Sequence, residues 1–179
     1  MHSGRIPDVA GAIAAAREKY GSAPAPRHRL VRQHLEGLRL QAEGGDARRR
    51  AAVDLWGAAD ALMTVLELAL DDAALCLVGR AARGHGEAGA AAHVRVYTEA
   101  SVRDLAELLV AQGYEEPRIE TAHTRWGRLD RLRFHDDGRT WVVTRCAPSM
   151  WRDAKLDLFT RKAIEILPLE AVRKRLEAR

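Results

Sequence analysis

Apolar residues recur at helical spacing through the first seventy residues, and they alternate with polar residues in several short runs further along the chain. The helical spacing predicts helices at 9–20, 26–42 and 47–70, of which the last has the strongest apolar stripe. Another helix is expected at 102–112, with Ser101 as its N-cap and Gly113 as its terminator. A basic helix is expected at 169–178.

The alternating runs predict strands at 93–97, 118–124, 128–135 and 140–146. The last two form a hairpin around Asp136-Asp137-Gly138, a sequence that favours a tight turn. The run 74–79 is either a short buried strand or a continuation of the preceding helix. After Pro148 we expect a short helix and then a strand at 163–167.

Helix formers come first and strand formers later, which is typical of the α+β class. We therefore expect an N-terminal helical region, then a small mixed or antiparallel sheet with a packed helix, and a C-terminal helix. Breaker residues at 21–26 and Gly44-Gly45 divide the chain into a helical extension at 1–46 and an α+β domain at 47–179.

Composition and charge narrow the class of partner. The formal net charge is +4, and basic ends flank an acidic middle, which is compatible with a polyanionic partner. Abundant arginine with alanine and glycine is also typical of a GC-rich coding sequence. No apolar run approaches the ~20 residues of a membrane helix, so no membrane partner is expected. Two cysteines without metal-like spacing favour reduced thiols and a cytoplasmic location, and no motif identifies a cofactor or a metal site.

A basic sheet face is the strongest functional candidate. If the apolar residues of strands 93–97 and 128–135 share a core, their other face collects His93, Arg95, Arg131, Arg133 and His135. Arginine neutralises phosphate and tryptophan stacks on bases. The candidate nucleic-acid-binding residues are Arg95, Arg125, Trp126, Arg128, Arg131, Arg133, Trp141 and Arg145. The alternative interpretation is the ordinary solvent face of an antiparallel sheet.

The leading hypothesis is thus a non-catalytic module that binds nucleic acid or a nucleotide through this basic face. A second hypothesis is a protein–protein adaptor or regulatory protein. In that case the 47–70 helix would form a contact with a partner or with a second copy of the chain.

The stretch from Ala61 to Tyr97 resembles the opening of the polymerase-β-type nucleotidyltransferase fold. Leu77-Val78-Gly79 matches its strand and small-residue turn, and the helix at 102–112 also suits it. In that family the next strand carries two alternate carboxylates that hold metal ions. Here His93 and Arg95 occupy those positions, so the resemblance implies the fold without the usual catalysis.

The stretch from Gly127 to Val143 is similar to the central hairpin of PD-(D/E)xK nucleases, in which Asp130 would be the metal-binding acid. Thr144 and Cys146 stand where that family has an acid and a lysine. The third hypothesis is therefore an enzyme with an atypical site, a nucleotidyltransferase-fold or nuclease-like protein, for which Asp130 is the one catalytic candidate.

Overall fold

The chain divides into two units at the start of its main helical stripe. The structure is a computed structural model that describes Glu18, residues 28–85 and residues 90–178. Backbone contacts group Met1–Arg50 and Ala51–Arg179. The helix expected at 9–20 lies outside the described residues, except for Glu18. The helices expected at 26–42 and 47–70 form α2, His28–Ala69, which is interrupted at Gly44 by non-helical backbone (φ 70°, ψ 157°).

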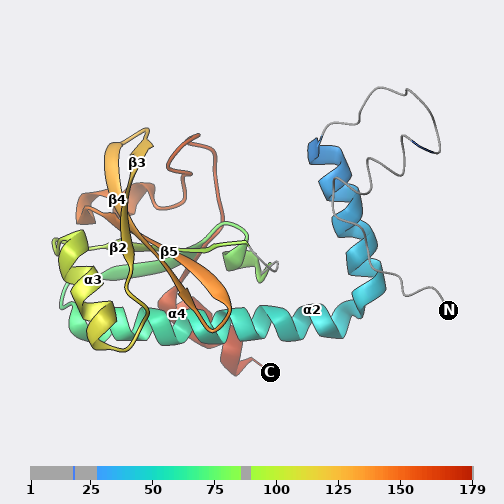
Figure 1. Ribbon diagram of the computed structural model, residues 1–179, viewed down its shortest axis with the longest axis horizontal. Coiled ribbons are helices and arrows are strands. Elements are labelled where there is room, and N and C mark those ends of the chain that lie inside the picture. The colour runs from blue at the N-terminus through green and yellow to red at the C-terminus, as the bar shows by residue number, and fades with distance from the viewer. Residues whose placement is uncertain (1–17, 19–27, 86–89, 179) are drawn as a thin grey trace. The chain divides into compact units, whose positions relative to one another are not determined.

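The remaining elements confirm the α+β class (Figure 1). Along the chain they are β1 Ala74–Val78, the short 3-10 helix η1 Ala81–Arg83, β2 Ala92–Tyr97, α3 Val102–Ala111, β3 Arg118–Thr124, β4 Gly127–Asp136, β5 Arg139–Cys146, the 3-10 helix η2 Pro148–Asp153, β6 Ile166–Pro168 and α4 Leu169–Glu177. The run after α2 is thus a strand. The strand expected at 163–167 begins later, at Ile166, and Ala163 forms only an isolated bridge with Leu156.

Two local signals act as the sequence predicts. Ser101 accepts a hydrogen bond from the backbone N–H of Asp104, and the Asp104 carboxylate accepts one from the Ser101 N–H, so a complete capping box starts α3. Asp137 (φ 45°) and Gly138 (φ 70°) both adopt positive φ between β4 and β5. Such backbone angles match the twist of a two-residue hairpin turn, and the Asp-Gly pair tolerates them.

The sheet has the strand order β3-β4-β5-β2-β1-β6 and is mixed. β2 pairs with β5 in parallel, and the other neighbours are antiparallel. α3 and the β3–β4 hairpin lie in the long connection between β2 and β5. β5 therefore lies inside the sheet, where the four residues from Trp141 to Thr144 are all buried.

The two faces of the sheet have different covers. On the first face, Val94, Val96, Leu132 and Phe134 pack with α2, α3 and α4 in the main core. Figure 1 shows these helices against the sheet. On the second face a smaller core contains Cys76, Val78, Tyr97, Cys146 and Ala154. The segment between β5 and β6 packs over this part of the second face through Ala154, Met150 and Ile164.

The apolar stripe of α2 is buried in the main core of the domain. Leu55, Leu62, Met63 and Leu66 are at most 1% exposed in the main core. On the polar side of the same helix, Arg173 of α4 donates hydrogen bonds to Asp60, Thr64 and Glu67. The contact surface expected on the 47–70 helix is therefore largely occupied by the domain itself. Among the described residues, no helix combines the length and apolarity needed to cross a bilayer.

Candidate functional site

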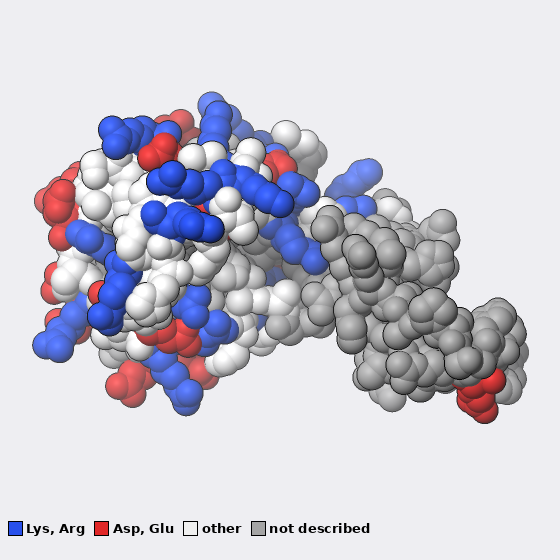
Figure 2. Space-filling view, turned by 90° about the horizontal axis from the view of Figure 1, so that it is seen from above, with Lys and Arg blue, Asp and Glu red and all other residues white. Residues whose placement is uncertain are grey.

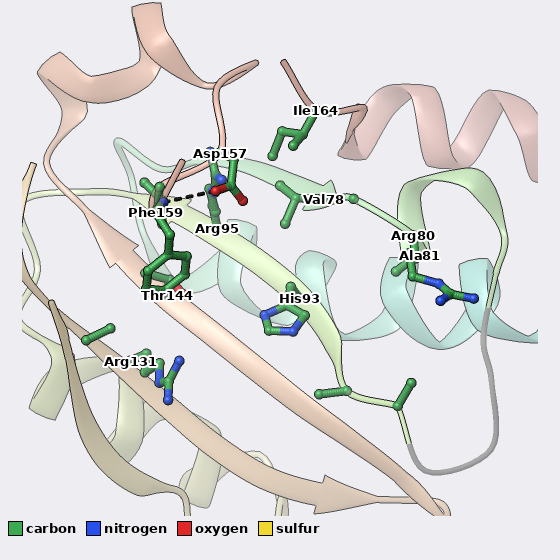
Figure 3. A pocket seen from close by; sticks show the side chains of 15 residues that line it. Val78, Arg80, Ala81, His93, Arg95, Arg131, Thr144, Asp157, Phe159 and Ile164 are labelled. Carbon is green, nitrogen blue, oxygen red and sulfur yellow. Dashed lines mark hydrogen bonds between the residues drawn. The ribbon is translucent and has the colours of Figure 1, made fainter. Parts of the chain in front are cut away.

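A pocket of about 470 Å³ opens on the second face of the sheet (Figure 3). Its floor is formed by side chains from four neighbouring strands, among them Ala122, Arg131, Thr144 and His93. In the sheet register Thr144 pairs with Arg131 on one side and with Arg95 on the other. Strands two apart are separated by roughly 10 Å, and the short threonine side chain between them leaves the hollow open.

The walls of the pocket come from two loops. One is the turn after β1, with Gly79, Arg80 and Ala81. The other lies between η2 and β6 and supplies Asp157, Leu158 and Phe159. Most of the lining is apolar, whereas its charged groups are mainly cationic. The pocket thus combines apolar lining with a positive field from its cationic floor, a combination that suits a small organic anion.

Arg95 has a structural position within this site. It is 4% exposed, and its Nη1 donates to the carbonyl oxygens of Ala154 (3.0 Å) and Leu156 (2.9 Å). The guanidinium thereby attaches the loop after η2 to the second face of the sheet. Arg95 was expected to contact a ligand directly. Its hydrogen bonds instead hold the wall of the pocket, although its charge still acts inside it.

Arg131 and Arg133 project from the second face, as their alternation predicts, and share one carboxylate. Glu120 on β3 accepts hydrogen bonds from Arg131 Nε at 2.8 Å and from Arg133 Nε at 3.0 Å. Burial alone would raise the pKa of Glu120. The hydrogen bond from Arg131 and the charge of Arg133 outweigh that effect, so the pKa lies below its usual value. Two guanidinium groups facing one carboxylate leave one positive charge uncompensated.

His93 lines the pocket together with Arg131 and Arg95 (Figure 3). Part of the His93 side chain is exposed. The surrounding protein nevertheless shields the imidazolium from much of the water, and this desolvation lowers the pKa of His93. The charges of Arg131, Arg133 and Arg95 lower the pKa further. His93 is therefore neutral at pH 7, with one nitrogen that can donate a hydrogen bond and one that can accept one.

Replacing Arg131 with Gln should raise the pKa of His93, because Arg131 is the largest of the three charge effects on it. An NMR titration of the His93 ring proton measures this. Arg103→Gln on α3 makes the same change of charge on the other side of the sheet and should leave the pKa unchanged. An equal His93 pKa in the two variants would show that the charge of Arg131 does not lower the pKa of His93.

The lowered pKa also has a consequence for stability. The unfolded chain binds a proton at His93 more readily than the folded one, so stability falls as pH drops below about 6.5 toward the folded-state pKa. The Arg131→Gln variant should show a smaller loss over this interval.

Arg95 and Arg131 line the pocket, whereas three other candidate residues project from the opposite face of the sheet. Trp141 is 1% exposed on the first face, opposite Phe134, and belongs to the main core. The buried indole offers no surface for base stacking, which corrects the expected role. Arg145 also points to the first face, where it donates to the carbonyls of Ala100 and Glu99. Arg128 is exposed on that side of β4, by alternation with Leu132.

Asp130 lies on the same side as Arg128 and accepts a hydrogen bond from Thr121 Oγ1 at 2.8 Å. It is exposed, and the sheet separates it from His93 and Arg131. Within residues 28–85 and 90–178, no three His, Cys, Asp or Glu side chains gather in a way that could hold a metal ion.

Arg125 and Trp126 in the β3–β4 turn do approach the second-face loop. Arg125 donates through its backbone N–H to Leu158 O (2.9 Å) and through Nε to Phe159 O (3.3 Å). The Arg161 guanidinium lies 5.0 Å from the centre of the Trp126 ring. The two residues selected from the sequence therefore lie beside the pocket wall. The sequence analysis did not predict the loop that they contact.

That loop, residues 157–162, was not recognised from the sequence. Asp157 Oδ1 accepts from the backbone N–H groups of Phe159 and Thr160 and from Thr160 Oγ1. Asp157 N–H also donates to Lys162 O, which closes the loop at 2.8 Å. Desolvation would raise the pKa of Asp157, but the hydrogen bonds from Thr160 and Phe159 keep it below its usual value. The Asp-x-x-Thr pattern from Asp157 to Thr160 is the sequence signal that could have predicted this turn.

The two cysteines do not supply a nucleophile. Cys76 and Cys146 are fully buried in the smaller core. Burial raises the pKa of Cys76 to about 12 and that of Cys146 to about 11, so both thiols stay protonated at neutral pH.

Comparison with known proteins assigns no family. No protein-family model matches the chain, and no curated protein is similar enough in sequence to be a relative. The fold and the pocket therefore define this chain as an α+β domain with a cationic hollow on one sheet face.

Proposed function

We propose that the domain at Ala51–Arg179 is a non-catalytic module that binds a nucleotide in the second-face pocket. The observation that carries the proposal is the meeting of Arg131, neutral His93 and apolar lining residues in one hollow of about 470 Å³. Pockets of roughly 300–1,000 Å³ commonly hold small organic ligands. A phosphate would interact with the Arg131 side, and a base would lie over the apolar part.

The charges around the pocket support an anionic ligand. Arg95, Arg131 and Arg133 contribute three positive charges to the field at His93. Among the residues that the structure describes, the nearby carboxylates are Glu120, which the two β4 arginines hold, and Asp157, which its own loop holds. A bound phosphate adds the negative charge that this arrangement leaves uncompensated.

We propose a non-catalytic module because the pocket lacks, among the described residues, the acidic side chains that would hold catalytic metal ions. His93 and Arg95 stand at the positions that carry metal-binding acids in the nucleotidyltransferase fold which the sequence resembles. Val78 and Gly79, two of the three residues that match the strand and turn of that fold, line the pocket. A nucleotide site without the acids would bind its ligand and leave its phosphate bonds intact.

The test is a calorimetric titration with nucleoside 5′-monophosphates, the matching nucleosides and inorganic phosphate. The monophosphate should bind saturably and more tightly than either of its parts. Arg131→Gln should weaken it about tenfold or more, since hydrogen bonds from charged groups contribute roughly 1.5–3 kcal/mol. His93→Ala, at an exposed position, should weaken it without unfolding the domain.

Arg103→Gln is the matched control and should bind as the parent does. The proposal fails if no monophosphate saturates the parent protein, or if the two pocket variants bind as well as the control. Equal affinity for inorganic phosphate alone would also contradict it, because the apolar lining of the pocket would then contribute nothing.

A further inference from the structure

The 157–162 loop presents polar and aromatic side chains beside the pocket. Phe159 lines the pocket and is also 50% exposed, so the pocket opens directly onto the outer surface of the loop. Arg161 and Lys162 follow it and are exposed. Arg125 and Trp126 of the β3–β4 turn adjoin them through the contacts with Leu158, Phe159 and Arg161. These five residues are the hairpin–loop surface: Arg125, Trp126, Phe159, Arg161 and Lys162.

The loop holds this surface in one conformation. Its backbone closes on itself at Asp157–Lys162, and Arg161 N–H donates to Asp157 O at 2.9 Å. Arg161 adopts φ 57°, a left-handed conformation that costs an L residue of this size free energy. The Asp157 hydrogen bonds hold the strained turn, which directs the guanidinium over the Trp126 ring. A surface fixed in this way loses little entropy when it binds.

In the part of the chain that the structure describes, the hairpin–loop surface is cationic and the acids nearest to it are engaged elsewhere. Asp157 is engaged by its own loop, and Glu165 beyond the loop lies against Arg83 and Arg175. Figure 2 views the domain from above Figure 1, the side toward which the β3–β4 hairpin extends, and shows Lys and Arg side chains across this side. Basic side chains interleaved with partly exposed aromatic rings match the alternating phosphates and unstacked bases of a single strand.

We propose that the hairpin–loop surface binds a single-stranded nucleic acid whose end nucleotide occupies the pocket. The inference rests on the proposed function, because it extends the ligand of that site to a longer chain. Arg125, Arg161 and Lys162 neutralise the phosphates next to the bound nucleotide. Phe159 and Trp126 stack against the bases that follow.

The test is a titration of the full chain with oligothymidylate and oligouridylate of one, three, six and twelve nucleotides at two salt concentrations. Affinity should rise with length until the strand covers the loop, and the gain should shrink at the higher salt. Arg161→Ala/Lys162→Ala should lower the affinity for the twelve-nucleotide strands about tenfold. It should also reduce the slope of log affinity against log salt by about 1.4, from two lost contacts at 0.7 each.

The matched control is Arg103→Ala/Lys174→Ala, which removes two exposed positive charges from α3 and α4 and should change neither quantity. Length-independent affinity would overturn the inference, as would an equal loss in the control. So would equally tight binding of a duplex of the same length, because a duplex does not expose its bases for stacking.

The mononucleotide separates the two proposals. If it binds and longer strands bind no better, the hairpin–loop inference fails and the pocket stands. If it does not bind while long strands bind through Arg161 and Lys162, the pocket proposal fails and the surface alone remains.

Discussion

Trp141→Ala should lower the free energy of unfolding by about 3–5 kcal/mol, the usual range for removing a large aromatic side chain from a core. The indole is 1% exposed on the central strand β5. It packs in the main core with Leu132, Phe134 and Val143, so its removal leaves a cavity that the surrounding sheet cannot fill. Denaturant unfolding, followed by circular dichroism because the variant loses a fluorophore, measures the change.

Two variants control this experiment. Trp141→Phe keeps most of the ring volume and should lose much less stability. Arg139→Ala removes the guanidinium that lies 5.8 Å from the Trp141 ring centre and should have a small effect, since Arg139 is partly exposed at the β4–β5 turn and a single cation–π contact there contributes little. Unchanged stability together with lost ligand binding in Trp141→Ala would mean that the indole contacts ligand and that its core role is wrong.

Arg95→Ala should lower the free energy of unfolding by about 2–4 kcal/mol and loosen the loop between η2 and β6. The substitution leaves the carbonyls of Ala154 and Leu156 without their buried donor, and such unpaired groups are costly. Amide hydrogen exchange measures the local effect. Protection should fall at Ile164, whose N–H donates to Lys155 O inside this loop.

The control for this prediction is Arg95→Lys, which keeps the charge but not the planar donor geometry and should fall between the parent and Arg95→Ala. Because Asp157 and Phe159 form the pocket wall, nucleotide affinity should decline in the same order. Parental stability and parental exchange at Ile164 in Arg95→Ala would show that the guanidinium does not attach the loop.

Local sequence determined most of the secondary structure. The Asp-Gly turn between β4 and β5 and the Ser101–Asp104 capping box each depend on residues within a few positions of one another. Strand alternation likewise placed Arg131 and Arg133 on the face opposite Leu132, because successive side chains in a strand point to opposite sides. These features need no knowledge of distant contacts.

The role of each candidate residue depended on distant contacts. The sequence suggests that Arg95 binds a ligand. In the structure its guanidinium instead donates hydrogen bonds to backbone carbonyls about sixty residues later in the chain. Trp141 is consistent with either stacking or packing until the parallel pairing of β2 with β5 places it in the core. The 157–162 loop belongs to the candidate site because the fold brings it into contact with the β3–β4 turn, which is distant in sequence.

The sequence by itself thus determined the α+β class, the strands β2 to β5, the hairpin and the side of the sheet to which Arg131 and Arg133 project. The tertiary structure decided which arginines of that face carry structural bonds and where a pocket remains between them. The physical reason is range: turns, caps and alternation follow from neighbouring residues, whereas burial and charge compensation follow from segments that only folding brings together.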